Sequence, residues 1–205
     1  MRIYILILAA LVLGACTLKP VETVYHEEKD FTRFTTKAII TKTGSKEIEL
    51  VASKECPGKV ICTDQEIKLK VTHKDRFSLL KGKDLVLEAD QDKLDLNERD
   101  YSNSYDMNKI AKDGTDGVLN EQFLIWVSES DFRKAAYSQS VIMKVGDDSF
   151  ELSIEGRNSW QIMLDKERLL EIMDEEQQRE YGLYTHERKD KKEITVQEKR
   201  MSSEA

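Results

Sequence analysis

Residues 141–154, VIMKVGDDSFELSI, carry the clearest secondary-structure signal in this chain. Apart from Lys144, the run 141–145 is apolar, and it is rich in β-branched residues, which favour strands. The turn sequence Gly-Asp-Asp-Ser at 146–149 follows, and apolar and polar residues then alternate through 150–154. This pattern is typical of an antiparallel hairpin with one buried face. It therefore predicts a mainly β fold.

Similar strand signals occur on both sides of this hairpin. Each is either a period-two alternation or a short apolar run bounded by polar residues. We expect strands in the segments 31–41, 47–52, 66–71, 85–87, 94–96 and 123–127. The stretch 97–120 is polar and contains two glycines, and we interpret it as a long loop.

Two helices are expected in the C-terminal half. Ser128 or Ser130 is suited to cap a short helix near 129–138. Residues 159–181 place apolar side chains at helical spacing, which predicts a longer helix that ends near Gly182. The predicted fold is thus mainly β (α+β): an antiparallel sheet or sandwich of about eight strands with these two helices.

The composition argues against a nucleic-acid-binding protein. The chain has 205 residues, with 39 acidic and 32 basic side chains and a net charge of −7. Proteins that grip nucleic-acid phosphates need an excess of positive charge. The length fits one ordinary domain.

The first sixteen residues, MRIYILILAALVLGAC, have the outline of a secretion signal. One basic residue precedes an uncharged run at 3–13, and small residues follow at 14–15. The run is too short for a permanent membrane span, which needs about 20 apolar residues. We therefore expect residues 1–15 to be removed as a signal peptide.

Leu13-Gly14-Ala15-Cys16 resembles the lipobox of bacterial lipoproteins. The resemblance covers residues 1–16 only. It implies that the Cys16 thiol receives a diacylglycerol, that cleavage occurs before Cys16, and that the new amino terminus is acylated, with palmitate among the acyl groups. Two or three acyl chains hold a protein stably at a membrane. The alternative is an ordinary secretory signal in which Cys16 happens to follow two small residues.

The residue after Cys16 bears on the location. Lipoproteins kept in the inner membrane of Gram-negative bacteria typically carry Asp there, whereas this chain has Thr17. By the same resemblance, we expect anchoring in the cell outer membrane, on its periplasmic or its surface side.

Cys56 and Cys62 are the two cysteines that remain once Cys16 is assigned to lipid. An even number of cysteines in an exported chain predicts a disulfide. Because both flanks are predicted strands, the bridge would close a hairpin loop. The alternatives are a redox pair or half of a zinc site. They are less favoured because the spacing is not C-x-x-C and only His73 lies near in sequence.

The predicted organisation has four parts. A signal peptide (1–15) precedes a lipidated N terminus and tether (16–28). A single β-rich domain (29–184) is followed by a charged tail expected to be flexible (185–205). The order of elements in the domain resembles a pattern seen in uncharacterised exported bacterial proteins, and no activity follows from that likeness.

No catalytic residue, metal site or cofactor site is predicted. The three histidines, at positions 26, 73 and 186, lie in no hydrolase or metal motif. Two acidic groups have calcium-like composition without the ligand spacing of a calcium loop, and we interpret them as solvated turns: Asp90, Asp92, Asp95, Asn97 and Glu98, then Asp113 and Asp116. An aromatic set is assigned to the core rather than to a ligand pocket: Phe123, Trp126, Phe132, Phe150 and Trp160.

The sequence therefore predicts a lipid-anchored bacterial envelope protein with a non-catalytic interaction or scaffold domain. Its expected partners are the membrane, through the lipid on Cys16, and an envelope protein, and no nucleic acid is expected. One alternative is a lipid-tethered binding module for a small molecule or a metal ion. A less favoured alternative is an envelope enzyme.

Overall fold

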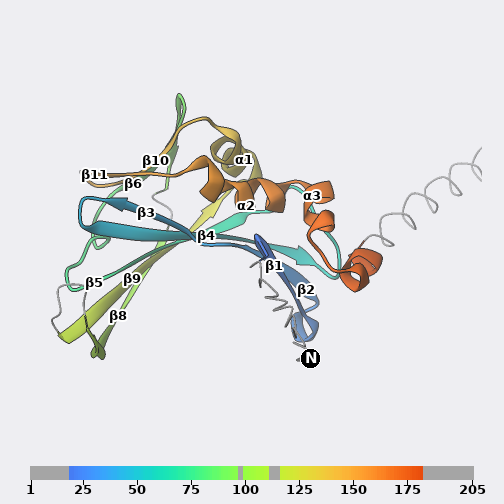
Figure 1. The fold of residues 1–205 in the computed structure, drawn as a ribbon, viewed down its shortest axis with the longest axis horizontal. Coiled ribbons are helices and arrows are strands. Elements are labelled where there is room, and N and C mark those ends of the chain that lie inside the picture. The colour runs from blue at the N-terminus through green and yellow to red at the C-terminus, as the bar shows by residue number, and fades with distance from the viewer. Residues whose placement is uncertain (1–18, 97–98, 111–115, 182–205) are drawn as a thin grey trace, which may run out of the picture.

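The computed structural model describes residues 19–181 except 97–98 and 111–115, and in these residues it contains two antiparallel sheets (Figure 1). The mainly β prediction is confirmed, although the described residues form eleven strands rather than about eight. The larger sheet contains β1 (Val21–His26), β2 (Phe31–Thr36), β3 (Ile39–Thr43), β4 (Lys46–Pro57), β5 (Ile67–Asp75), β8 (Arg99–Ile110) and β9 (Asp116–Val127). The smaller sheet contains β6 (Leu85–Ala89), β7 (Asp92–Asp95), β10 (Val141–Val145) and β11 (Asp148–Glu151).

The strand order places the long strand β4 near the middle of the larger sheet. That order is β1-β2-β4-β5-β9-β8, and β3 pairs with the first half of β4 while β2 pairs with its second half. The smaller sheet has the order β11-β10-β6-β7. The hairpin expected at 141–154 is present as β10 and β11, although β11 ends at Glu151 because the chain then enters a helix.

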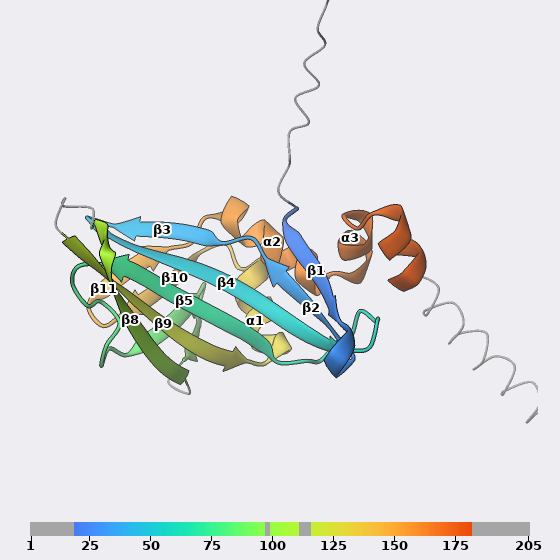
Figure 2. The ribbon, with the colours of Figure 1, turned by 90° about the horizontal axis from the view of Figure 1, so that it is seen from below.

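One face of the larger sheet is buried beneath helices and the smaller sheet (Figures 1 and 2). The register aligns apolar side chains of neighbouring strands, as in the row Leu50, Val71 and Phe123. Buried apolar residues of the three central strands include Ile48, Leu50, Ala52, Ile67, Leu69, Val71, Phe123 and Ile125. Because side chains alternate in a strand, the lysines of β5 fall on the opposite, open face.

The short predicted helix is confirmed as α1 (Glu129–Tyr137), with Ser128 as its N-cap. The single long helix predicted at 159–181 is wrong. The chain instead forms α2 (Ile154–Leu164), α3 (Lys166–Glu171) and a helical segment at 175–181. Asp165 adopts an extended conformation that ends α2, and its carboxylate then caps α3.

Two further expectations are corrected by strand pairing. The segment 97–120, expected to be a loop, contains all of β8 and the first part of β9, which pair with each other. Residues 21–26, expected in the tether, form β1, which pairs with β2 along its whole length. β1 and β8 are the two edge strands of the larger sheet, where backbone hydrogen bonds to one neighbour hold a polar strand in place.

Arg157 of α2 joins the helices to the smaller sheet. Its side chain is buried, with 1% of the residue exposed. The guanidinium donates hydrogen bonds to main-chain carbonyls at the end of α1, in the following loop and after β11: those of Ala135, Ala136, Ser138, Gln139 and Leu152, at 2.6–3.5 Å. A cation at a helix C-terminus also interacts favourably with the partial charge of the exposed carbonyls.

We expect Arg157→Met to lower the free energy of unfolding by about 3 kcal/mol, because several buried carbonyls would lose their donors. Urea unfolding followed by circular dichroism measures the loss. Arg168→Met is the matched control, since Arg168 of α3 contacts side chains at the surface and its loss should cost less than about 1 kcal/mol. Equal losses in the two variants would contradict this role for Arg157.

Candidate functional site

The predicted disulfide between Cys56 and Cys62 is present, and it closes a tight loop at one end of the larger sheet. The two Cα atoms are 5.5 Å apart. Cys56 is fully buried near the end of β4, whereas Cys62 is partly exposed. The backbone N–H of Cys62 donates to the Cys56 sulfur at 3.1 Å, so the loop is held by covalent and hydrogen bonds together.

The disulfide loop is attached to the turn between β1 and β2. Gly58 donates its backbone N–H to the carbonyl of Asp30 at 2.7 Å, and its own carbonyl accepts from the Thr32 hydroxyl at 2.7 Å. Gly58 has a φ of +67°, in the left-handed region that favours glycine. A larger residue here would strain the loop and disturb both bonds.

The helical segment at 175–181 contacts the same loop. Glu180 forms an ion pair with Lys59, and the Tyr181 hydroxyl lies 3.0 Å from the Thr32 hydroxyl. The Tyr181 ring also packs edge-on against Phe34. Residues 25–33, 56–62 and 175–181 are therefore brought together, and we refer to these three segments as the disulfide end.

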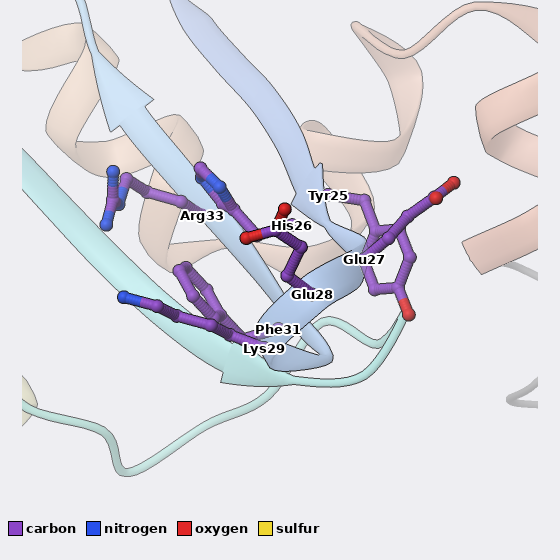
Figure 3. A pocket seen from close by; sticks show the side chains of 7 residues that line it. All are labelled: Tyr25, His26, Glu27, Glu28, Lys29, Phe31 and Arg33. Atoms are coloured by element: carbon purple, nitrogen blue, oxygen red, sulfur yellow. The ribbon is translucent and has the colours of Figure 1, made fainter.

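An open hollow of about 470 Å³ lies on the β1–β2 side of the disulfide end (Figure 3). His26 stacks on Phe31 with ring centroids 4.5 Å apart, and the Arg33 guanidinium lies 5.3 Å from the centre of the same ring. Arg33 also pairs with Glu55 at 2.7 Å. The residues that line the hollow are Tyr25, His26, Glu27, Glu28, Lys29, Phe31 and Arg33. Partly exposed aromatic rings thus lie beside charges of both signs, a combination that is common in protein interfaces.

A buried ion pair joins the disulfide loop to α1. Lys54 of β4 donates to the carbonyl of Cys62 at 2.9 Å, and its ammonium lies 3.7 Å from a carboxylate oxygen of Glu129. Arg133 binds the other oxygen of Glu129 at 2.9 Å. Burial lowers the pKa of Lys54, and the negative charge of Glu129 opposes that shift. Because a buried charge without its partner is destabilising, the pair couples the loop to the start of α1.

Glu121 holds a loop at the opposite end of the sheet through many hydrogen bonds. Its buried carboxylate accepts hydrogen bonds from five donors: the hydroxyls of Ser78 and Tyr101 and the backbone N–H groups of Leu79, Leu80 and Lys81. Burial alone would raise the pKa of Glu121, but these bonds outweigh it and lower the pKa. A carboxylate held so firmly as an anion is a structural anchor for residues 78–81.

The described histidines are not brought together. His26 lies at the disulfide end, whereas His73 lies at the far end of β5, opposite Glu121 in the register. Both ring nitrogens of His73 contact backbone carbonyls, those of Glu47 and Phe77. Cys16 and His186 lie outside the described residues.

Only some of the acidic residues singled out in the sequence lie within the described residues. Asp90 occupies a left-handed turn position and accepts from the backbone N–H groups of Gln139 and Ser140, which lower its pKa. Asn97, Glu98 and Asp113 lie outside the described residues, as do the side chains of Asp95 and Asp116.

Four of the five aromatic residues assigned to the core are buried as expected, namely Phe123, Phe132, Phe150 and Trp160. The core assignment of Trp126 is wrong, because its position in β9 points to the open face and 41% of it is exposed.

In the part of the chain that the structure describes, no three His, Cys, Asp or Glu side chains gather as a metal site. Within the same residues, no helix has the length and apolar character needed to cross a bilayer. Comparison of the chain with protein-family models, curated proteins and solved structures gives no match.

Sequence reasoning identified the disulfide but missed the site around it. The contacts of Gly58 with Asp30 and of Lys59 with Glu180 join segments 28 and 121 residues apart. The Pro57-Gly58 pair was a signal for a turn, but nothing in it indicates which strands that turn will meet.

Replacing both cysteines, as Cys56→Ala/Cys62→Ala, should lower the free energy of unfolding by about 2 kcal/mol, because a short cross-link no longer restricts the unfolded chain. Hydrogen exchange should also become faster at the Gly58 amide and in the β1–β2 turn. Urea unfolding and exchange measured by mass spectrometry check the two effects. The oxidised parent protein is the reference, and the parent treated with reductant should behave like the variant. Unchanged stability and exchange would contradict the organising role of the disulfide.

Proposed function

We propose that this protein is a bacterial envelope lipoprotein, held at the membrane by acyl chains on Cys16, with a non-catalytic domain that binds an envelope partner. The observation that carries the proposal is the lipobox-like sequence Leu13-Gly14-Ala15-Cys16 directly after the apolar run of the leader. Thr17 supports anchoring in an outer membrane rather than retention in an inner one.

The disulfide supports an exported location. Disulfides persist in oxidising compartments such as the bacterial periplasm and are rare in the cytosol. The bond between Cys56 and Cys62 also uses both cysteines other than Cys16, which leaves the Cys16 thiol as the remaining one for lipid.

The geometry of the disulfide end favours a macromolecular partner over a small molecule. The hollow in Figure 3 is open to solvent, whereas small-molecule sites enclose most of their ligand. Its surface combines Tyr25, Phe31, Lys29 and Arg33 with nearby acids. Aromatic residues and arginine are enriched in protein interfaces. A disulfide, an ion pair and backbone hydrogen bonds stabilise this surface, which reduces the entropy lost when a partner binds.

The anchor is tested by labelling cells with radioactive palmitate. The parent protein should carry label, and Cys16→Ser should carry none, because the acyl groups need the Cys16 sulfur and the amino terminus that cleavage creates. Cys62→Ser is the matched control and should keep the label. Equal label in the parent and in Cys16→Ser would reject the lipoprotein proposal.

The partner surface is tested by a photoreactive amino acid placed at one position in living cells. Substitution at the exposed Lys29, on the rim of the hollow, should give a discrete cross-linked product. The same residue at Asp147, in the β10–β11 turn far from the disulfide end, should not (Figure 2). The product should decline when Cys56 and Cys62 are replaced by alanine. Identical products from both positions, or none from Lys29, would reject this surface as the binding site.

A further inference from the structure

We propose that the domain rests on the bilayer through one particular face, which lies beside Lys19 and which we call the anchor face. This inference depends on the proposed lipid anchor and adds to it the surface that meets the membrane. The anchor face is a hollow with a floor of Val21 and Met173 and a rim of Lys19, Glu22, Thr23, Ile172 and Gln177.

Only a short length of chain separates Cys16 from the folded body. The sequence alone suggested a tether through residue 28, which could extend about 40 Å. In the structure, however, the sheet begins at Val21. Lys19 is only three residues beyond Cys16, so their Cα atoms are at most about 11 Å apart. The polar headgroup region on each side of the hydrocarbon core is itself about 5–7 Å thick, so the body cannot stand far from the surface.

The second step is that the chain joins the body at a defined place. The carbonyl of Pro20 accepts a hydrogen bond from the backbone N–H of Lys37 at 2.8 Å, and Val21 is buried. Lys19 also forms an ion pair with Asp174 at 3.6 Å. The lipid is therefore linked to the folded body beside the anchor face.

β1 runs from the anchor face to the β1–β2 turn. Figure 2 shows that β1 begins beside α2 and α3 and ends at the β1–β2 turn. Its six residues span about 17–20 Å, since each residue of a strand advances about 3.3 Å. The anchor face therefore includes the start of β1, whereas the hollow in Figure 3 lies at the end of β1 and the turn that follows. The two surfaces are separate, so membrane contact through the anchor face does not require the hollow itself.

The charges around the anchor face specify the kind of membrane surface. Glu22 and Asp174 lie at or beside it, and Glu175 and Glu176 follow in the next helical turn. Lys19 is the one basic side chain among the residues that line the hollow. This acidic surface is not attracted to anionic lipids, so it fits zwitterionic headgroups and depends on the anchor for contact.

The test uses tryptophan emission and vesicles of phosphatidylcholine that carry a nitroxide quencher on part of the headgroups. The full lipidated protein is purified with Trp126→Phe, which removes the exposed native tryptophan, whereas Trp160 is buried. Gln177→Trp places the probe on the anchor face, and Asp147→Trp places the matched control in the β10–β11 turn. Gln177→Trp should lose most of its added emission on vesicle binding, and Asp147→Trp should keep its emission.

Equal quenching at both positions, or stronger quenching at Asp147, would overturn the anchor face. Thr23→Trp, on the same rim, gives a second probe if Gln177→Trp does not fold. The anchor itself is judged separately. The parent should bind the vesicles and Cys16→Ser should not. If the parent carries no acyl group and does not bind, the proposed function fails, whereas a bound parent with equal quenching rejects the orientation alone.

Discussion

The buried guanidinium of Arg157 is the interaction on which the arrangement of layers depends. It binds the carbonyls of the loop that leaves α1, and the carboxylate of Asp90 binds the backbone N–H groups of Gln139 and Ser140 in the same loop. In the short loop after α1, Arg157 thus donates hydrogen bonds to backbone carbonyls and Asp90 accepts hydrogen bonds from backbone N–H groups. Because polar backbone groups are costly to bury without partners, this connection has one favourable place between the helices and the smaller sheet.

The disulfide end is also a connection held by specific polar contacts, here at the surface. The loop between Cys56 and Cys62 packs Val60 and Ile61 against the core, and it is also held by a covalent bond, by the backbone bonds of Gly58 and by the ion pair of Lys59 with Glu180. The buried pair of Lys54 and Glu129 links it to α1. These interactions hold the aromatic and charged groups of the proposed partner surface in place.

Elements with a strong local signal were predictable from sequence. The β10–β11 hairpin and the Ser128 cap of α1 follow from turn residues and capping chemistry that act over a few residues. The disulfide followed from cysteine number. The missed elements depend on distant partners: the polar edge strand β8 and the first part of β9 pair with each other, and the edge strand β1 pairs with β2. Helical spacing at 159–181 also concealed the break at Asp165, whose carboxylate stabilises the start of a new helix more than the continuation of the old one.

By itself, the sequence determined the β-rich character, the short capped helix, the pairing of Cys56 with Cys62 and the expectation of a lipid on Cys16. These features depend on residue type and on neighbours close in the chain. Only the tertiary structure decided that residues 21–26 form a strand of the larger sheet, that Trp126 faces solvent, and that three distant segments meet at the disulfide end. The physical reason is that the register between strands and the packing of one layer on another are set by the summed burial of many side chains, which no local pattern contains.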